Sequence, residues 1–188
     1  MTSTICQDKR ESSNQISKSK FIDSCHVQTK SINTSRIYCQ FQQLAVQKLV
    51  GIVCDAVPGA DKFISVNRIT LFLELLQQKL NLHIEEIIAA MELLQRFISK
   101  QQIKDDQVLR VSNVGMLIIV SFVLALKLSR DKILNNKVFA NMFGVPIVNL
   151  NQSEICFLQI IDFELWVEFD NYSLLEDVPQ INETIDTQ

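Results

Sequence analysis

The chain has 188 residues with a formal net charge of −3, and its hydrophobic content of 47 % is enough for one domain with a single core. Four glycines and three prolines are too few for the many tight turns of an all-β fold, so the composition predicts an all-α protein. A middle part with balanced charge and an acidic end argue against nucleic-acid binding, which requires a basic surface.

The residues that could carry chemistry are few, and we predict no catalytic, metal or cofactor site. The five cysteines are widely spaced and form no C-x-x-C pair, which argues against a disulfide framework and against a zinc site. The stretch "HIEE", His83 to Glu86, lacks the second histidine of a helical zinc motif and is more typical of a helix start. We therefore expect neither an enzyme nor a protein that binds a small-molecule substrate.

The N-terminal residues contain no apolar run of the kind found in signal peptides, which predicts an intracellular protein of the cytoplasm, the nucleus or both. The most apolar run, residues 114–126, is closed by Lys127. A membrane-spanning helix needs about 20 apolar residues, so we expect this run to form a buried helix and the protein to have no membrane partner.

Four segments follow from the pattern of apolar and polar residues. Residues 1–35 are rich in Ser, Thr, Asn, Gln and Lys, and such a composition predicts a disordered tail. Residues 36–58 repeat apolar positions at intervals of three and four, which predicts a flanking helix. Residues 62–167 are expected to form the core domain, and the acidic residues 168–188 to be mostly disordered.

Residues 62–167 are predicted to form five helices, each with a start signal of its own, followed by "DFELWV" as an irregular apolar segment that packs back on the core. The first helix starts at Ser65 and has an apolar stripe of Ile69, Leu73, Leu76 and Leu80; the second starts at His83, and the third at Ser112 or Asn113. A short fourth helix starts at Asn135 or Asn136 and ends at Gly144. Pro146 precedes a fifth helix over residues 148–161, whose inward residues are Leu150, Phe157, Leu158 and Ile161. The third helix is apolar all round, so it belongs at the centre of the fold.

This layout, and the residues of its second half, resemble a single-box cyclin of the P or U type, the group related to phosphate-regulated yeast cyclins. The stretch "NVGMLIIVSFVLALKLSRDKILNNKVFANMFGVPIVNLNQSEICFLQIIDFELWV" can be aligned to that pattern without a gap. The matching features are "LALKL", Asp131, Asn135 and Asn136, Gly144, Leu150 and Asn151, Glu154, Phe157 and Leu158, and "IDFELWV". The first half, "LELLQQKLNLHIEEIIAAMELLQRFI", fits more loosely.

The resemblance implies a cyclin fold with five helices around a buried third helix, and a non-catalytic subunit of a cyclin-dependent kinase that acts in the cell cycle. Such a subunit holds the C-helix of the kinase in the active position. The resemblance places Lys127 and Glu154 at the kinase contact. Spacing alone favours a plainer interpretation, in which each of the two charges complements a helix dipole.

Two departures from the family pattern concern the first two helices. Cell-cycle cyclins pair an acidic residue at the end of the second helix with an arginine in the first, and the corresponding positions here are Gln95 and Val66. Their tryptophan-containing substrate-docking patch is not evident in "VNRITLFLELLQQ" either.

The alternative to a kinase activator is a cyclin-fold scaffold or transcription-factor-like module that binds other molecules without activating a kinase.

Overall fold

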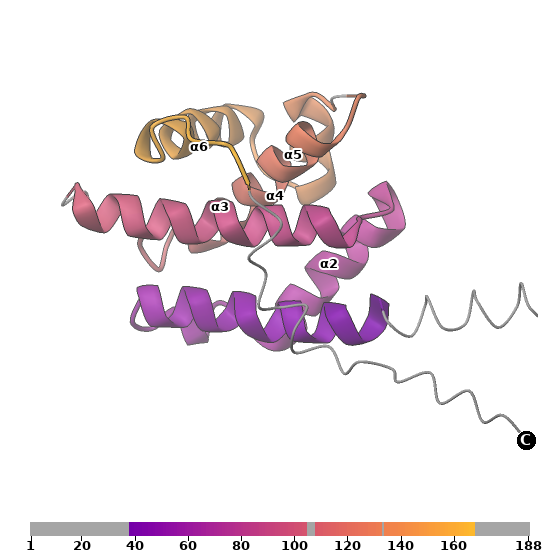
Figure 1. Ribbon diagram of the computed structural model, residues 1–188, viewed down its shortest axis with the longest axis horizontal. Coiled ribbons are helices and arrows are strands. Elements are labelled where there is room, and N and C mark those ends of the chain that lie inside the picture. The colour runs from indigo at the N-terminus through magenta and orange to yellow at the C-terminus, as the bar shows by residue number, and fades with distance from the viewer. Residues whose placement is uncertain (1–37, 105–107, 133, 168–188) are drawn as a thin grey trace, which may run out of the picture. The chain divides into compact units, whose positions relative to one another are not determined.

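The computed structural model describes residues 38–104, 108–132 and 134–167, and Figure 1 shows their arrangement. The chain divides into a unit of residues 1–40 and a unit of residues 41–188, and, apart from the first three residues of the first helix, the account below concerns the second. The predicted tails at residues 1–35 and beyond residue 167 lie outside the described residues. Everything regular in the described part is helical, so the predicted all-α class is confirmed.

The helices follow one another with short connections. A helix over residues 38–56 comes first, within the range predicted for the flanking helix. The remaining elements are the short 3-10 helix η1 (Ala60–Lys62), α2 (Val66–Leu80), α3 (Ile84–Ile103), α4 (Val114–Ser129), α5 (Asn136–Phe143) and α6 (Ile147–Ile160). No helix in the described part is long and apolar enough to cross a lipid bilayer.

Short-range hydrogen bonds explain where α2 and α3 begin and end. The Ser65 hydroxyl accepts from the backbone N–H of Arg68 at 3.4 Å, and α2 ends at Asn81, whose backbone is left-handed with φ 49°. His83 occupies the N-cap of α3, and its backbone N–H donates to the Glu86 carboxylate at 2.8 Å. The helix starts predicted at Ser65 and His83 are therefore confirmed.

Helix α4 is the centre of the core, as its all-round apolar sequence predicted. All side chains from Val120 to Leu126 are buried, and α3 and α6 cover the helix from two sides. From α2, the ring of Phe72 meets Phe122 edge-on, with centroids 5.2 Å apart and planes at 84°. The buried helix therefore decides where its neighbours lie.

The connection into α4 differs in detail from the expectation. Asn113 holds the N-cap position, but its side chain turns back to the preceding loop instead of capping the helix. Its Oδ1 accepts from the Arg110 N–H at 2.8 Å, and its Nδ2 donates to the Val108 carbonyl at 2.7 Å. The loop is fixed further by Gln101 of α3, which accepts from the Leu109 N–H at 2.9 Å.

Helices α5 and α6 begin close to the predicted residues. The Asn135 side chain accepts from the Val138 N–H at 3.2 Å, so Asn135 rather than Asn136 is the cap of α5. Gly144 ends α5 with φ 66°, a conformation that glycine adopts readily. Pro146 precedes α6, where Phe157 is fully buried and stacks on Phe97 of α3 at 4.7 Å.

The segment after α6 packs on the core only in part, which corrects the expectation for "DFELWV". Leu165 and Val167 contact the core, whereas the aromatic side chains of Phe163 and Trp166 are 63 % and 78 % exposed. Asp162 and Phe163 both have a left-handed backbone, with φ 57°, so the chain turns there, directly after α6. The Phe163 side chain lies at this turn, and Leu165 and Val167 beyond it reach the core.

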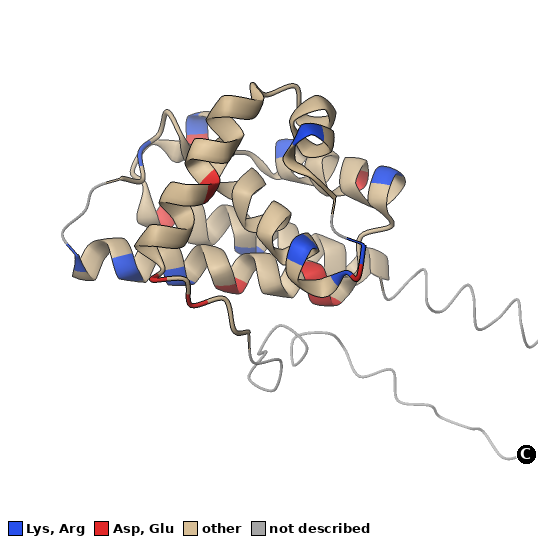
Figure 2. Cartoon of the chain, turned by 90° about the horizontal axis from the view of Figure 1, so that it is seen from above, with Lys and Arg blue, Asp and Glu red and all other residues tan. Residues whose placement is uncertain are grey.

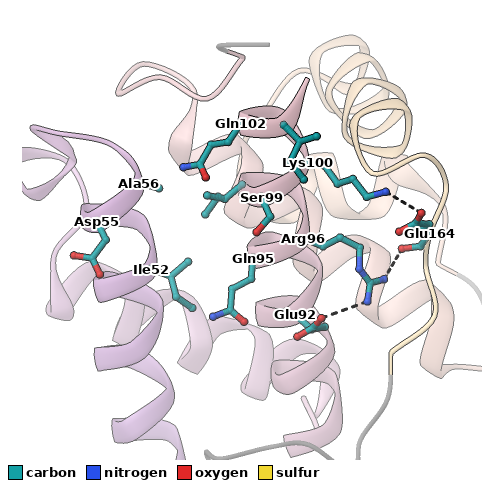
Figure 3. Close-up of a pocket in the computed structure, with 12 residues that line it drawn as sticks. Ile52, Asp55, Ala56, Glu92, Gln95, Arg96, Ser99, Lys100, Gln102 and Glu164 are labelled. Carbon is teal, nitrogen blue, oxygen red and sulfur yellow. Dashed lines mark hydrogen bonds and ion pairs between the residues drawn. The ribbon is translucent and has the colours of Figure 1, made fainter. Parts of the chain in front are cut away.

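Charged side chains of α3 hold this segment in place. Lys100 bonds to Asp162 at 3.2 Å and to Glu164 at 2.8 Å, and Lys104 bonds to Asp162 at 2.5 Å. Arg96 donates to the Glu164 carbonyl at 2.5 Å, as Figure 3 shows. The bonds from Lys104 and Lys100 lower the pKa of the Asp162 carboxyl, and those to Glu164 and Asp162 raise the pKa of Lys100.

The substitution Phe122→Ala should create a cavity beside the Phe72 ring and lower the free energy of unfolding by about 3–5 kcal/mol. The control is Leu71→Ala on the exposed face of α2, which should change it by less than about 0.5 kcal/mol. Urea denaturation followed by circular dichroism measures both. Equal effects of the two variants would contradict the central position of α4.

The substitution Asp162→Asn should lower the melting temperature at neutral pH. Because folding lowers the pKa of Asp162, its stabilisation is complete above the unfolded pKa and is lost as the pH falls through the lower folded value. The difference in melting temperature between Asp162→Asn and wild type should therefore shrink as the pH falls below about 4, and vanish below the folded pKa. Melting curves between pH 7 and pH 2.5 test this, with Asp61→Asn as the control, and a difference that does not depend on pH would contradict it.

Candidate functional site

The candidate site lies where the last turn of α4, the first residue of α5 and the middle of α6 come together. Lys127 belongs to α4, Asn136 to α5 and Glu154 to α6. The three residues come from three elements, and α6 packs against both of the others. This part of the fold therefore collects polar groups that are far apart in the sequence.

The structure brings the two residues expected at the site, Lys127 and Glu154, into direct contact. The Lys127 ammonium lies 2.5 Å from the first carboxylate oxygen of Glu154. The second oxygen accepts from the Asn136 side-chain amide, also at 2.5 Å. The side chain of Lys127 is 23 % exposed and that of Glu154 13 %, so the pair is shielded but reachable from outside.

The local sequence explains why both charges lie at an edge of the core. Lys127 directly follows the buried run that ends at Leu126, so its aliphatic stem continues the apolar surface while its ammonium extends outward. Glu154 comes four residues after Leu150 and three before Phe157, both of them fully buried. Residues with this spacing share one face of a helix, which brings the carboxylate to the rim of the buried face of α6.

Asn136 is the member of the site that the sequence reasoning missed, because it considered the asparagine only as a turn or cap residue. Its amide nitrogen donates both to Glu154 and, at 2.8 Å, to the side-chain oxygen of Asn151. Its own oxygen is buried and has no hydrogen-bond partner among the described residues. The available signal was the resemblance, which includes Asn136, Asn151 and Glu154 together.

The pair can still form bonds with a partner. An ammonium group has three hydrogens and a carboxylate about four acceptor positions. The bond between Lys127 and Glu154 occupies one position of each, and the Asn136 amide occupies one more on the carboxylate. The site therefore presents donors and acceptors side by side, as a protein partner with exposed backbone amides and carbonyls requires.

Apolar side chains on the same elements are exposed around these polar groups. In α6, Val148 and Ile155 lie one turn before and one turn after Asn151 and so share its face. Leu128 follows Lys127 and is exposed as well, as is Val138 of α5. Exposed apolar residues on the elements that carry the polar groups are compatible with a protein interface.

A second ion pair, also missed, lies directly after the last turn of α4. Arg130 follows the helix and reaches Glu86 in the first turn of α3, with Nε to Oε1 at 2.5 Å and Nη2 to Oε2 at 2.8 Å. Glu86 is only 2 % exposed, and its hydrogen bonds raise the pKa of Arg130 despite partial burial. The sequence indicated only a favourable helix-dipole charge at Glu86.

The two positions that depart from the family pattern do not face one another across the core. Val66 is 48 % exposed at the start of α2, and Gln95 is exposed on α3. Gln95 lines an open groove of about 730 Å³ with Ile52 and Asp55 of the helix over residues 38–56 (Figure 3). A charge at either position would be solvated, so its absence leaves no unpaired buried ion.

Removal of one partner from the site should destabilise the isolated protein modestly. We expect a coupling energy of about 1 kcal/mol in a double-mutant cycle of Lys127→Met and Glu154→Gln, because the pair is shielded but not fully buried. Urea denaturation of the wild type, both single variants and the double variant measures it. Additive effects of the two substitutions would show that the side chains are apart in solution.

The comparisons with known proteins concern the family and the fold of the chain. A family model described as Cyclin matches residues 8–165. No curated protein and no solved structure matches the chain. Within the described residues, no group of three or more His, Cys, Asp or Glu side chains could hold a metal ion. The match spans most of the chain and agrees with the helical fold around α4, so the chain belongs to the cyclin family and has the cyclin fold.

Proposed function

We propose that this protein is a single-box cyclin of the P or U type, which binds a cyclin-dependent kinase and activates it. It is a non-catalytic subunit and acts with its kinase in the cytoplasm, the nucleus or both. The observation that carries the proposal is the direct contact between Lys127 and Glu154, at 2.5 Å, on the rim of the α4 and α6 surface. The cyclin resemblance supports a role for these two residues, 27 apart in the chain, at the kinase contact.

The assignment to the P or U type is supported by the network around Glu154. The features of that type quoted above include the asparagine pair at the start of α5, the "LN" of α6 and the glutamate three residues later. In the fold, Asn136, Asn151 and Glu154 are joined by hydrogen bonds of 2.8 Å and 2.5 Å. Residues that match the family pattern at three separate places thus form one physical unit.

The proposed mechanism is a shift between two states of the kinase. An active kinase needs the ion pair between its strand lysine and its C-helix glutamate, and that pair forms only when the C-helix is held inward. Lys127 would donate to backbone carbonyls next to the C-helix and Glu154 would accept from backbone amides. A partner with higher affinity for the inward state shifts the equilibrium toward it by that difference in affinity.

The charges in the sequence of residues 37–167 fit a protein partner better than a nucleic acid. In Figure 2, acidic and basic residues are interspersed along the helices. Residues 37–167 contain equal numbers of the two kinds, with twelve Lys or Arg and twelve Asp or Glu. Nucleic-acid binding draws on a concentrated positive surface, so the transcription-factor-like alternative has less support than kinase binding.

Charge reversal at the pair tests the proposal. Lys127→Glu and Glu154→Lys should each abolish co-purification with a cyclin-dependent kinase from native cells, because each places a wrong charge against the kinase backbone. The double reversal should restore the ion pair but not the binding. The matched controls Lys79→Glu and Glu74→Lys, on the exposed part of α2, should leave the kinase bound.

Quantitative mass spectrometry of the purified complexes measures kinase recovery, and circular dichroism and thermal melting establish that the variants are folded. Failure of the wild-type chain to recover any cyclin-dependent kinase at low salt would refute the proposal. Recovery of other proteins without a kinase would favour the scaffold alternative. Tight DNA binding with a steep dependence on salt would favour the transcription-factor-like one.

A further inference from the structure

We propose that the ion pair between Arg130 and Glu86 is a positioning device for the kinase contact, because it holds the last turn of α4 in the place where Lys127 meets Glu154. Neither residue is expected to touch the kinase, so both would act through Lys127. This inference rests on the proposed function, since it assigns the pair a role in that same contact.

The last turn of α4 is held from two sides by residues one helical turn apart. Lys127 bonds to Glu154 of α6, and Arg130, three positions later, bonds to Glu86 of α3. The backbone of Arg130 is already extended, with φ −118° and ψ 135°, so the chain leaves the helix there. The arginine pair therefore fixes the point at which α4 ends, next to the residue that presents the ammonium.

The two ion pairs differ in what they can offer a partner. The Glu86 side chain is 3 % exposed, against 13 % for Glu154. Glu86 receives two bonds from Arg130 and a third from the backbone N–H of His83. A buried carboxylate with three donors has little capacity left for a kinase. The pair of Arg130 and Glu86 therefore orients the end of α4, and the pair of Lys127 and Glu154 binds the kinase.

The geometry of the pair suits orientation better than stabilisation. A guanidinium that bonds through two nitrogens fixes direction as well as distance, which a lysine ammonium does not. Replacement of a buried ion pair by neutral side chains of similar size is often neutral or favourable for stability. The effect to look for is therefore a less ordered end of α4 and weaker kinase binding in a protein that remains folded.

The main test variant is the double substitution Glu86→Gln with Arg130→Met. It removes both charges together, leaves no unpaired ion in the interior and keeps an acceptor for the His83 N–H. Arg130→Lys keeps the charge but not the two-nitrogen geometry, so it should fall between wild type and the double variant. The control is Arg96→Met, which breaks an ion pair elsewhere on α3, with Glu92 at 3.3 Å.

The first measurement needs no kinase. Amide hydrogen exchange of residues 124–129 should be faster in the double variant than in wild type, and the NMR signal of the Lys127 side chain should shift toward that of a solvated lysine. The Arg96→Met control should show neither change. Unchanged exchange and an unchanged Lys127 signal in a folded double variant would overturn the inference, whatever the kinase experiments give.

The second measurement uses the kinase that co-purifies with the wild-type chain. The double variant should bind it roughly fivefold more weakly or worse, because substitutions at neighbouring, contacting residues are energetically coupled. In a Lys127→Ala background the same double substitution should cause no further loss of affinity, because the pair acts through Lys127. Equal losses in the two backgrounds would show a general structural effect and overturn the inference.

The two measurements separate this inference from the proposed function. If the wild-type chain recovers no kinase, the proposed function fails, while hydrogen exchange and the Lys127 signal still decide whether the arginine pair orders the end of α4. If the wild type binds a kinase and the double variant binds it equally well, only the positioning role fails.

Discussion

The arrangement of this protein depends on the burial of α4. A helix that is apolar on all sides loses stability wherever water reaches it, so each side needs an amphipathic neighbour. Helices α3 and α6 supply two of these neighbours, and α2 contributes Phe72 against Phe122. The only strongly polar positions that α4 can carry are then at its ends. Lys127 and Arg130 both lie at the C-terminal end, which is why the two ion pairs that involve this helix form there.

Much of the fold could be predicted because it is decided by neighbours in the sequence. The capping residues Ser65, His83 and Asn135 and the left-handed Gly144 act within three or four residues of themselves, so local rules suffice for them. The burial of α4 is likewise predicted by a local pattern, because its apolar residues follow one another in the sequence. The predicted start of α6 was one residue late, since Pro146 caps it and the helix begins at Ile147.

The features that sequence reasoning missed depend on partners far along the chain. Glu86 is buried only because Arg130 comes from 44 residues away to pair with it, and no local pattern signals that meeting. Asn136 was predicted to be a turn or cap residue because local rules assign asparagine to such positions. Its side-chain amide instead donates hydrogen bonds to Glu154 and Asn151. Lys127 and Glu154 were predicted at one site only from their alignment to the cyclin pattern. Their spacing in the sequence alone favoured two separate charges, each of which complements the dipole of its own helix.

The central place of α4 also affects how the protein is made. On the ribosome, α4 is complete before the chain of α6 exists, and α6 is one of the two helices that cover it most. Until residues 147–160 emerge, the segment at 114–126 is the most apolar part of the nascent chain and lacks the cover that α6 supplies. Completion of the core, and with it formation of the Lys127 site, therefore waits for nearly the last residues of the domain. Chaperones that recognise exposed apolar segments would find their target in this interval.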